Sequence, residues 1–362
     1  MEVSRNLALL SRARMLNDED MTAFVGVGNM VRWVRATGVE RVLTGLVEYL
    51  EADFVRWQSF EKSPRVANHT PFGVIELMPI TDPDLYAFKY VNGHPFNPAR
   101  GFQTVTAFGV LADVHNGYPI FAAEMTLLTA LRTAATSAMF ARSLARPDSA
   151  VMAMIGAGSQ AEFQALAFRA VLGIDRLRVW DVDPDATDKL VRNLTPLGFT
   201  IHRATSASDA VSGADIVTTC TADKASATVL SADDIRPGMH LNAIGGDCPG
   251  KTELDPRILP LARIFTEFTP QTRIEGEIQL AASDHPVTEF WEVLTGLTPG
   301  RRSAEDITLF DSVGFAIEDF SALRYVRDQT KDTDFTEDID LVAEPENPKD
   351  LFGFLSTPVP VF

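Results

Sequence analysis

The chain has 362 residues, of which 46% are hydrophobic and 22% charged, as is usual for a globular protein with a large buried core. Its formal net charge of −17 argues against nucleic acid and anionic membranes as partners. No apolar run approaches the roughly 20 residues that cross a bilayer, and the two cysteines, Cys220 and Cys248, favour a reducing cytoplasm and offer no metal-ligand spacing.

The N-terminal region begins with arginines among short apolar pieces, and we expect residues 1–20 to form an ill-ordered extension. Gly26 and Gly28 follow in a Gly-x-Gly pattern without a preceding strand, which we interpret as a turn. Apolar residues at helical spacing then predict an amphipathic helix over residues 39–60.

Four strands separated by turn residues come next and predict a mostly antiparallel layer. They span residues 72–80, 85–92, 102–113 and 118–123. Two charged residues, Glu76 and Lys89, share strand faces with apolar side chains, and Arg65 lies just upstream. Two interpretations are open: the charged face is solvated, or it forms a basic pocket with one carboxylate, suited to an amino acid.

A long Ala-, Leu- and Thr-rich helix is predicted over residues 126–146 and ends before Pro147. Arg132 is the charged residue in its first turns. It either reaches solvent along its aliphatic stem or belongs to the same basic pocket.

A glycine loop follows the continuously apolar strand 150–155, which is typical of a covered parallel sheet. Gly156-Ala-Gly158-Ser-Gln-Ala161 then leads into a helix. In this strand–turn–helix context the first glycine makes the tight turn and the second lets backbone amides approach a pyrophosphate at the helix N-terminus. The loop therefore predicts a dinucleotide site.

The next strand ends at Asp181, where a carboxylate bonds a ribose 2′-hydroxyl and repels a 2′-phosphate, which favours NAD over NADP. Asp183 competes for this role, and Asp181 as a helix cap is the simpler alternative. Helices and strands then alternate as far as strand 262–267, which predicts a doubly wound parallel sheet.

A later strand of this sheet, residues 239–244, runs into Gly245-Gly-Asp247-Cys-Pro-Gly250. Viewed alone, Asp247 is a turn residue, because Asp beside Gly is ordinary in loops. Its place at the carboxyl edge of a parallel sheet, where ligands bind, makes it a candidate for chemistry.

Several stretches together resemble one known family. They are Arg65-Val-Ala67, Val74 to Pro79, Tyr86 to Pro95, Thr129 to Thr136, the glycine loop, Gly245 to Leu254 and Phe310 to Phe315. As a set they resemble the ornithine cyclodeaminase/μ-crystallin family, from about residue 22 to the acidic, Pro-rich tail.

The resemblance implies conversion of L-ornithine to L-proline and ammonia in the cytoplasm, with NAD⁺ used catalytically. It implies a Rossmann-type doubly wound α/β domain over residues 132–314. It also implies a discontinuous α+β domain, residues 1–131 and 315–362, that binds substrate and forms a homodimer.

The resemblance also assigns roles to residues. It implies that Arg65, Lys89 and Arg132 hold the substrate carboxylate, that Glu76 lies near the amino groups, and that Asp247 is the acid/base residue. Met78 and Val313 line the pocket. The positions expected to bind NAD are Thr104, Arg132, Gly156, Gly158, Ser159, Gln160, Asp181, Thr221, Asn242, Ala243, Ile244, Lys251 and Ser312.

The implied chemistry suits these residues. Hydride leaves Cα for NAD⁺ and gives an imine, which the neutral δ-amine attacks, so that a carboxylate is needed as general base. Ring closure expels ammonia, and the same NADH returns the hydride.

Three alternatives stay open. The chain is a relative that acts on lysine, a ketimine reductase or amino-acid dehydrogenase of the same family, or a non-catalytic NAD(P)-linked small-ligand binder. The set Arg65, Glu76, Lys89 and Asp247 argues against the binder, which needs no buried base.

Overall fold

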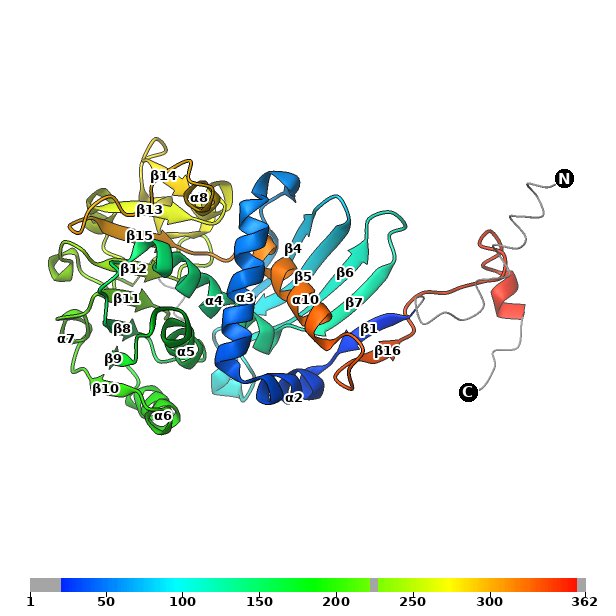
Figure 1. Ribbon diagram of the computed structural model, residues 1–362, viewed down its shortest axis with the longest axis horizontal. Helices are drawn as coiled ribbons and strands as arrows, with labels where there is room; N and C mark the ends of the chain where they lie inside the picture. Colours follow the sequence, from blue (N-terminus) through cyan, green and yellow to red (C-terminus); the bar gives the residue numbers. More distant parts are fainter. Residues whose placement is uncertain (1–20, 222–226, 357–362) are drawn as a thin grey trace.

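The computed structural model describes residues 21–221 and 227–356, so the extension expected at residues 1–20 lies outside the described residues. Two sheets organise this part of the chain (Figure 1). In the described ranges, no helix is both long and apolar enough to span a membrane.

The first sheet has the strand order β16-β1-β7-β6-β5-β4-β2, with β3 paired to β4. Its strands are β1 (Thr22–Val25), β2 (Glu61–Lys62), β3 (Val66–Thr70), β4 (Gly73–Thr81), β5 (Leu85–Gly93), β6 (Val105–Asp113), β7 (Pro119–Glu124) and β16 (Glu337–Ile339). All pairs from β2 to β7 are antiparallel, which confirms the predicted layer, and β1 adds a parallel strand beside β7.

The register of this sheet places some side chains on a buried inner face and others on an exposed outer face. Met78 lies opposite Lys89, and Glu76 opposite Val91, on a buried face. Because the side-chain period of a strand is two, the next residues point the other way. Leu77, Tyr90 and Phe108 lie side by side on the outer face, where Leu77 is 45% and Phe108 48% exposed.

Helix α10 (Ala316–Thr330) covers the inner face of the first sheet, and α3 (Val39–Val55) packs against α10. The helix predicted over 39–60 is thus confirmed, although it ends at Val55. The turn expected at Gly26 and Gly28 was wrong, because Gly26 is the N-cap of a helix, α2 (Val27–Thr37).

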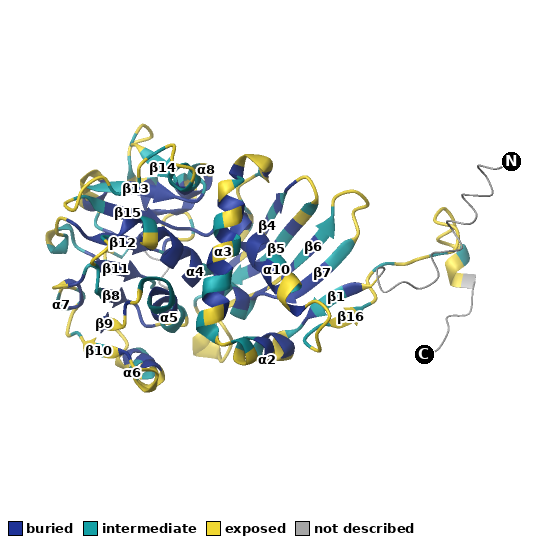
Figure 2. Cartoon of the chain, viewed as in Figure 1, coloured by how far each residue is buried: buried dark blue, intermediate teal, exposed yellow. Residues whose placement is uncertain are grey.

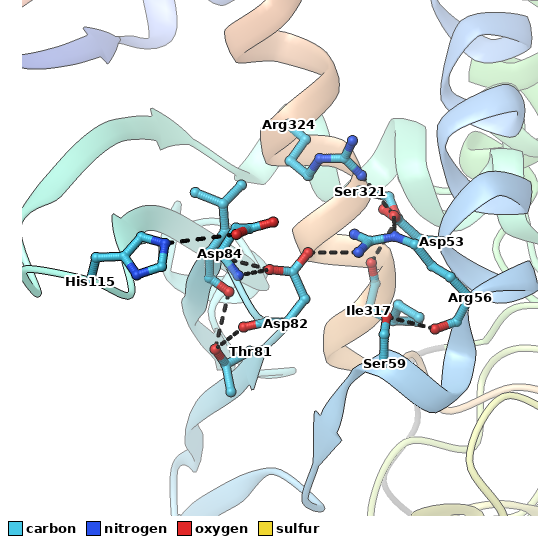
Figure 3. A network of polar contacts seen from close by, with 11 residues as sticks. Asp53, Arg56, Ser59, Thr81, Asp82, Asp84, His115, Ile317, Ser321 and Arg324 are labelled. Carbon is cyan, nitrogen blue, oxygen red and sulfur yellow. Dashed lines mark hydrogen bonds and ion pairs between the residues drawn. The ribbon is translucent and has the colours of Figure 1, made fainter.

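A buried carboxylate ties these elements together (Figure 3). Asp53 on α3 accepts hydrogen bonds from Ser321 (2.7 Å) and Arg324 (2.6 Å) of α10, and from Arg56 (2.8 Å). Arg56 also donates to Asp82 in the β4–β5 turn (2.7 Å). This network fixes α10 against the sheet and so positions the acidic residues at the start of α10.

The second sheet is parallel throughout and has the order β10-β9-β8-β11-β12-β15-β13-β14, which confirms the doubly wound prediction. Its strands are β8 (Val151–Ile155), β9 (Arg176–Trp180), β10 (Thr200–Arg203), β11 (Ile216–Thr219), β12 (His240–Ala243), β13 (Ala262–Thr266), β14 (Val287–Glu289) and β15 (Ile307–Asp311). Its helices are α5 (Ala161–Leu172), α6 (Pro184–Leu194), α7 (Ala207–Val211), α8 (Thr269–Glu275) and α9 (Phe290–Leu294).

Two segments join the sheets. The first is α4 (Thr126–Leu144), whose Phe140 stacks on Phe290 and Phe310 with ring centroids 3.7 and 3.6 Å apart. The second is the short connection from β15 to α10, residues 312–315. Buried residues run continuously across this junction (Figure 2).

The C-terminal arm, residues 340–356, leaves β16 and extends away from both sheets (Figure 1). It is mostly exposed, and Leu351, Phe352 and Leu355 are 62%, 79% and 80% exposed. The tail therefore does not pack back onto its own body.

Candidate functional site

The glycine loop lies at the point where the strand order of the second sheet reverses, between β9 and β11 on either side of β8. Gly156 has φ +101°, and a Cβ there would lie 2.8 Å from the carbonyl oxygen of Cys220, so only glycine suits this turn. A Cβ on Gly158 would meet no atom within 4 Å. The loop thus leaves open space before the N-terminus of α5, as a pyrophosphate requires.

The carboxylate of Asp181 closes this loop from the end of β9. It accepts from the backbone N–H of Ala157 (2.6 Å) and of Asp183 (2.8 Å). Asp183, in turn, is the N-cap of α6 and accepts from Asp185 (3.0 Å). Asp183 therefore takes the capping role, and Asp181 is the carboxylate beside the glycine loop. These residues fit a dinucleotide.

Other positions expected to bind NAD have their side chains engaged within the protein. Thr221 donates its N–H to Glu253 (2.7 Å), and Asn242 donates to Thr218 (3.2 Å). The backbone of Ala243 accepts from Ser312 (2.9 Å). The ends of β11, β12 and β15 thus form one continuous edge, and Ile244 directly follows β12 there. Ser159 and Gln160 lie in the loop after β8, the strand that pairs with β11.

Thr104 lies apart from that edge. Its carbonyl accepts from His94 in the β5–β6 hairpin (2.8 Å). Among the described residues no hydrogen bond or ion pair joins it to the second sheet, so its role in NAD binding stays a prediction.

Three buried carboxylates support the loops of this edge. Asp311 accepts from the N–H groups of Glu277 and Ile278 (both 2.9 Å), and Glu277 accepts from those of Glu253 (2.7 Å) and Leu254 (3.0 Å). Burial raises the pKa of Asp311 to about 7 and that of Glu277 to about 8. We call Asp311, Glu277 and Glu253 the carboxylate ladder. The last carboxylate of the ladder, Glu253, packs against Gly245. A Cβ on Gly245 would lie 2.2 Å from it.

Arg65 lies between the two sheets, and its side chain is only 6% exposed. It donates to Glu76 (3.0 Å) and to the carbonyls of Val313 and Gly314 (the latter 2.7 Å), and its Nε lies 3.1 Å from Glu275. Burial opposes its charge, but Glu76, Glu275 and Asp247 more than offset this and raise its pKa.

Lys89 and Arg132 share a second buried acid group on α10. Lys89 Nζ and Arg132 Nε lie 2.8 and 3.0 Å from Asp319 Oδ1, and Arg132 also pairs with Glu318. Burial and then the charge of Arg132 lower the pKa of Lys89 to about 8. Lys89 and Arg132 are only 1% and 5% exposed. The interpretation of a solvated charged face is therefore wrong, and so is that of an Arg132 that reaches solvent.

Glu267 lies behind this cluster, at the end of β13. It accepts from the hydroxyl of Ser312 (2.6 Å) and the N–H of Gly314 (3.2 Å). Burial, and then the charge of Glu318, raise its pKa to about 8. Its carboxyl group is therefore easier to protonate than that of a solvated glutamate.

Asp247 differs from the expected buried base. Its side chain is 57% exposed, and its carboxylate lies 3.2 Å from the buried ammonium of Lys251. The Gly245-Gly246 loop projects it outward from the edge of the sheet. Asp247 nevertheless acts electrostatically on Arg65 and Glu275, so it belongs to the same cluster of charges. Met78 and Val313 lie buried beside that cluster.

Sequence reasoning missed several acidic residues of this site: Glu267, Glu275, Glu318 and Asp319. The signal for the last two was an acidic pair in the first turn of a helix that follows Phe310 to Phe315. In the described part of the chain, no group of histidine, cysteine and carboxylate side chains could hold a metal ion.

Comparison with known proteins shows extensive similarity. Residues 27–334 match the model of the ornithine cyclodeaminase/mu-crystallin family. The chain is 60% identical to the ornithine cyclodeaminase of Agrobacterium fabrum over 93% of this chain and 95% of the relative. It is 59% identical to the ornithine cyclodeaminase of Brucella suis over 93% and 94%.

Solved structures share the fold. A lysine cyclodeaminase studied for its recognition of L-lysine, L-ornithine and L-2,4-diaminobutyric acid superimposes with a TM-score of 0.86 at 29% identity, covering 92% of this chain and 99% of that one. An archaeal alanine dehydrogenase dimer with bound NAD gives 0.80 at 31% identity, covering 89% and 99%.

Proposed function

The chain belongs to the ornithine cyclodeaminase/mu-crystallin family, and from this premise and its site we propose that it converts L-ornithine to L-proline and ammonia with NAD. One observation carries the proposal. Three buried cations, Arg65, Lys89 and Arg132, gather between the sheets, and the carboxylate of Asp247 interacts with this group from the edge of the dinucleotide sheet.

The cations hold the α-carboxylate of the substrate. An ammonium has three N–H donors and a guanidinium five, which is more than the contacts of Lys89 and Arg132 with Asp319 and Glu318 use. Holding the carboxylate fixes Cα, which turns a bimolecular encounter into an oriented one.

When bound, NAD⁺ would supply the hydride acceptor for Cα and, as NADH, the hydride donor that reduces the cyclic imine to proline. The glycine loop and the N-terminus of α5 hold its pyrophosphate, and Asp181 bonds its ribose. Asp247 takes a proton from the δ-ammonium, so that this nitrogen can attack the imine carbon. Because Asp247 is exposed, it returns that proton to water.

Product analysis tests this function. Purified protein with ornithine and substoichiometric NAD⁺ should release proline and ammonia in equal amounts, without accumulating NADH. Stoichiometric NADH would instead indicate an amino-acid dehydrogenase, and no turnover with tight binding of an unrelated ligand would indicate a binding protein.

Lysine is the second candidate substrate, because a structural neighbour is a lysine cyclodeaminase. One methylene in a pocket is worth roughly 1–3 kcal/mol, or about 10- to 200-fold in kcat/KM. Side-by-side rates on ornithine and lysine decide between them. We expect ornithine to be preferred, since the relatives at 59–60% identity are ornithine cyclodeaminases.

We also propose a homodimer in the cytoplasm. The outer face of the first sheet carries Leu77, Tyr90 and Phe108, with Tyr90 stacked on Phe108 at 5.3 Å. Contiguous exposed apolar side chains of this kind mark protein interfaces. A second copy of the chain is the partner proposed here. The two cysteines of the chain, Cys220 and Cys248, suit a reducing compartment.

A further inference from the structure

Glu275 lies between the two sheets and has no role in the mechanism proposed above. It ends α8, is 5% exposed, and its Oε2 lies 3.1 Å from Arg65 Nε. This contact is an ion pair without the geometry of a hydrogen bond. Arg65 Nε, Glu275 Oε2 and Glu76 Oε1 are all buried atoms that make no hydrogen bond within the protein.

Buried polar atoms without a partner are rare, and a group of three around one guanidinium marks a place for a polar ligand. Glu76 is held by a hydrogen bond from Arg65 (3.0 Å), whereas Glu275 is not held in this way. Of the two carboxylates beside Arg65, Glu275 is therefore the one that can exchange a proton with a ligand.

The inference rests on the proposed function, in which the ligand beside Arg65 is the amino-acid substrate. When the substrate carboxylate binds Arg65, Cα and its nitrogen are the next atoms of the substrate. They therefore lie beside the other groups that contact Arg65. The substrate carboxylate also competes with Glu275 for the guanidinium, which favours a proton on Glu275.

We propose that Glu275 is the acid/base residue of the α-nitrogen, acting twice on the same atom. It takes a proton from the α-ammonium before hydride leaves Cα. After the δ-nitrogen has bonded to the same carbon, Glu275 returns the proton to the α-nitrogen. The bond between carbon and that nitrogen breaks, its electron pair leaves with ammonia, and the ring nitrogen, having lost a proton to solvent, forms the new C=N bond.

The step balances without a further reactant, because the α-nitrogen leaves with three hydrogens, as it arrived. The surroundings of Glu275 suit a group that both takes and gives a proton near neutral pH. Burial, and then the charges of Glu76 and Asp247, raise its pKa to about 7, although Arg65 opposes them.

The test uses full-length protein with NAD⁺ and ornithine, mixed rapidly and followed at the absorbance of NADH. In wild type, the rate of NADH formation should rise with pH and level off above about 7. In Glu275→Gln it should be about 10²-fold lower at pH 7. Above pH 7 it should keep rising roughly tenfold per unit, because the α-ammonium of a free amino acid loses its own proton only at a higher pH.

A second signature concerns ammonia. In Glu275→Gln at high pH, NADH should persist at up to one per subunit, because the amine departs slowly without its acid. Glu275→Asp keeps the carboxyl and should retain the wild-type shape of the pH profile at a lower rate. Glu305→Gln, which changes an exposed glutamate far from Arg65 in sequence, should match wild type.

Three results would overturn the inference. They are a Glu275→Gln profile parallel to that of wild type, a variant that forms no NADH at any pH because ornithine no longer binds, and a wild-type profile that is flat from pH 5 to 9. The last needs no variant and so applies even if Glu275→Gln does not fold. Absence of proline from wild type would instead contradict the proposed function itself.

Discussion

The ammonium of Lys89 lies 2.8 Å from the carboxylate of Asp319, and both side chains are almost completely buried. The two residues come from β5 and α10, which are far apart in the sequence and meet because α10 covers the inner face of the first sheet. Asp319 keeps a cation in a place where burial disfavours charge.

The first prediction concerns the pH dependence of substrate binding. The pKa of Lys89 is lowered to about 8 by burial and Arg132, and Asp319 opposes this decrease. Above that pH the ammonium becomes neutral and loses its attraction for a carboxylate, so KM for ornithine should rise. In Asp319→Asn the pKa should fall further, and KM should begin to rise at a lower pH.

Titration of the ornithine amines affects both proteins equally, and Arg132 does not titrate in this range, so a shift in the pH at which KM begins to rise reports Lys89. The measurement is KM from pH 6 to 10, with kcat recorded separately. Identical profiles for wild type and Asp319→Asn would remove Lys89 from substrate binding.

The second prediction concerns Asp247. Replacement by asparagine keeps the size of the side chain and removes the base, so kcat should fall by about 10²- to 10⁴-fold. The dissociation constant for NAD⁺ should stay within about twofold, because Asp247 lies on the loop after β12 and not on the glycine loop. Fluorescence titration with NADH and steady-state rates check this, and wild-type turnover in Asp247→Asn would exclude the proposed role.

The elements that could be predicted from sequence are those whose signal is local. The apolar strand before Gly156 depends on a short local pattern, and the structure confirms it as β8. The periodicity of the first sheet placed Glu76 and Lys89 beside apolar residues but left open whether that face was solvated or formed a pocket, and the structure buries both. Strand β1 was missed, because its partners β7 and β16 lie about 100 and 300 residues away. A four-residue strand is not distinctive without them.

The carboxylates of the site were harder to predict than its cations. Glu275 ends a short helix that contains Arg273, and Glu277 follows it, a spacing of charges that is typical of a solvated surface. It is nevertheless buried and contacts Arg65, which precedes β3 of the other sheet. The exposure of Asp247 was also unpredictable, since the same Gly-Gly-Asp loop could direct the carboxylate inward or outward.

The third prediction concerns the dimer. If the outer face of the first sheet is the interface, Tyr90→Glu combined with Phe108→Glu should place charges in it and separate the subunits. Light scattering after gel filtration should give a mass near that of one 39.6 kDa chain instead of two. Leu297→Glu is the control, because Leu297 is 69% exposed and belongs to the other part of the chain. A control that also dissociates, or a double variant that remains dimeric, would contradict this interface.

The fourth prediction concerns the carboxylate ladder and stability. Burial, then the charge of Asp311, raise the pKa of Glu277 to about 8, above its value of about 4.5 in the unfolded chain. Between these two pKa values the folded state binds more protons than the unfolded state. The stabilising contribution of Glu277 is therefore complete below about pH 4.5 and declines as the pH rises to about 8. The melting temperature of wild type should therefore exceed that of Glu277→Gln most at pH 5.5 and least at pH 8.5.

The expected loss in Glu277→Gln has a structural cause. Each oxygen of Glu277 accepts a different backbone N–H, and an amide offers an acceptor to only one of them. Leaving a buried donor without a partner costs about 1–3 kcal/mol, which is a shift of roughly 1–4 °C in a chain of this size. Differential scanning fluorimetry from pH 5.5 to 8.5, with Glu305→Gln as the exposed control, measures both quantities. A difference that widens as pH rises would show that Glu277 is ionised in the folded protein throughout this range.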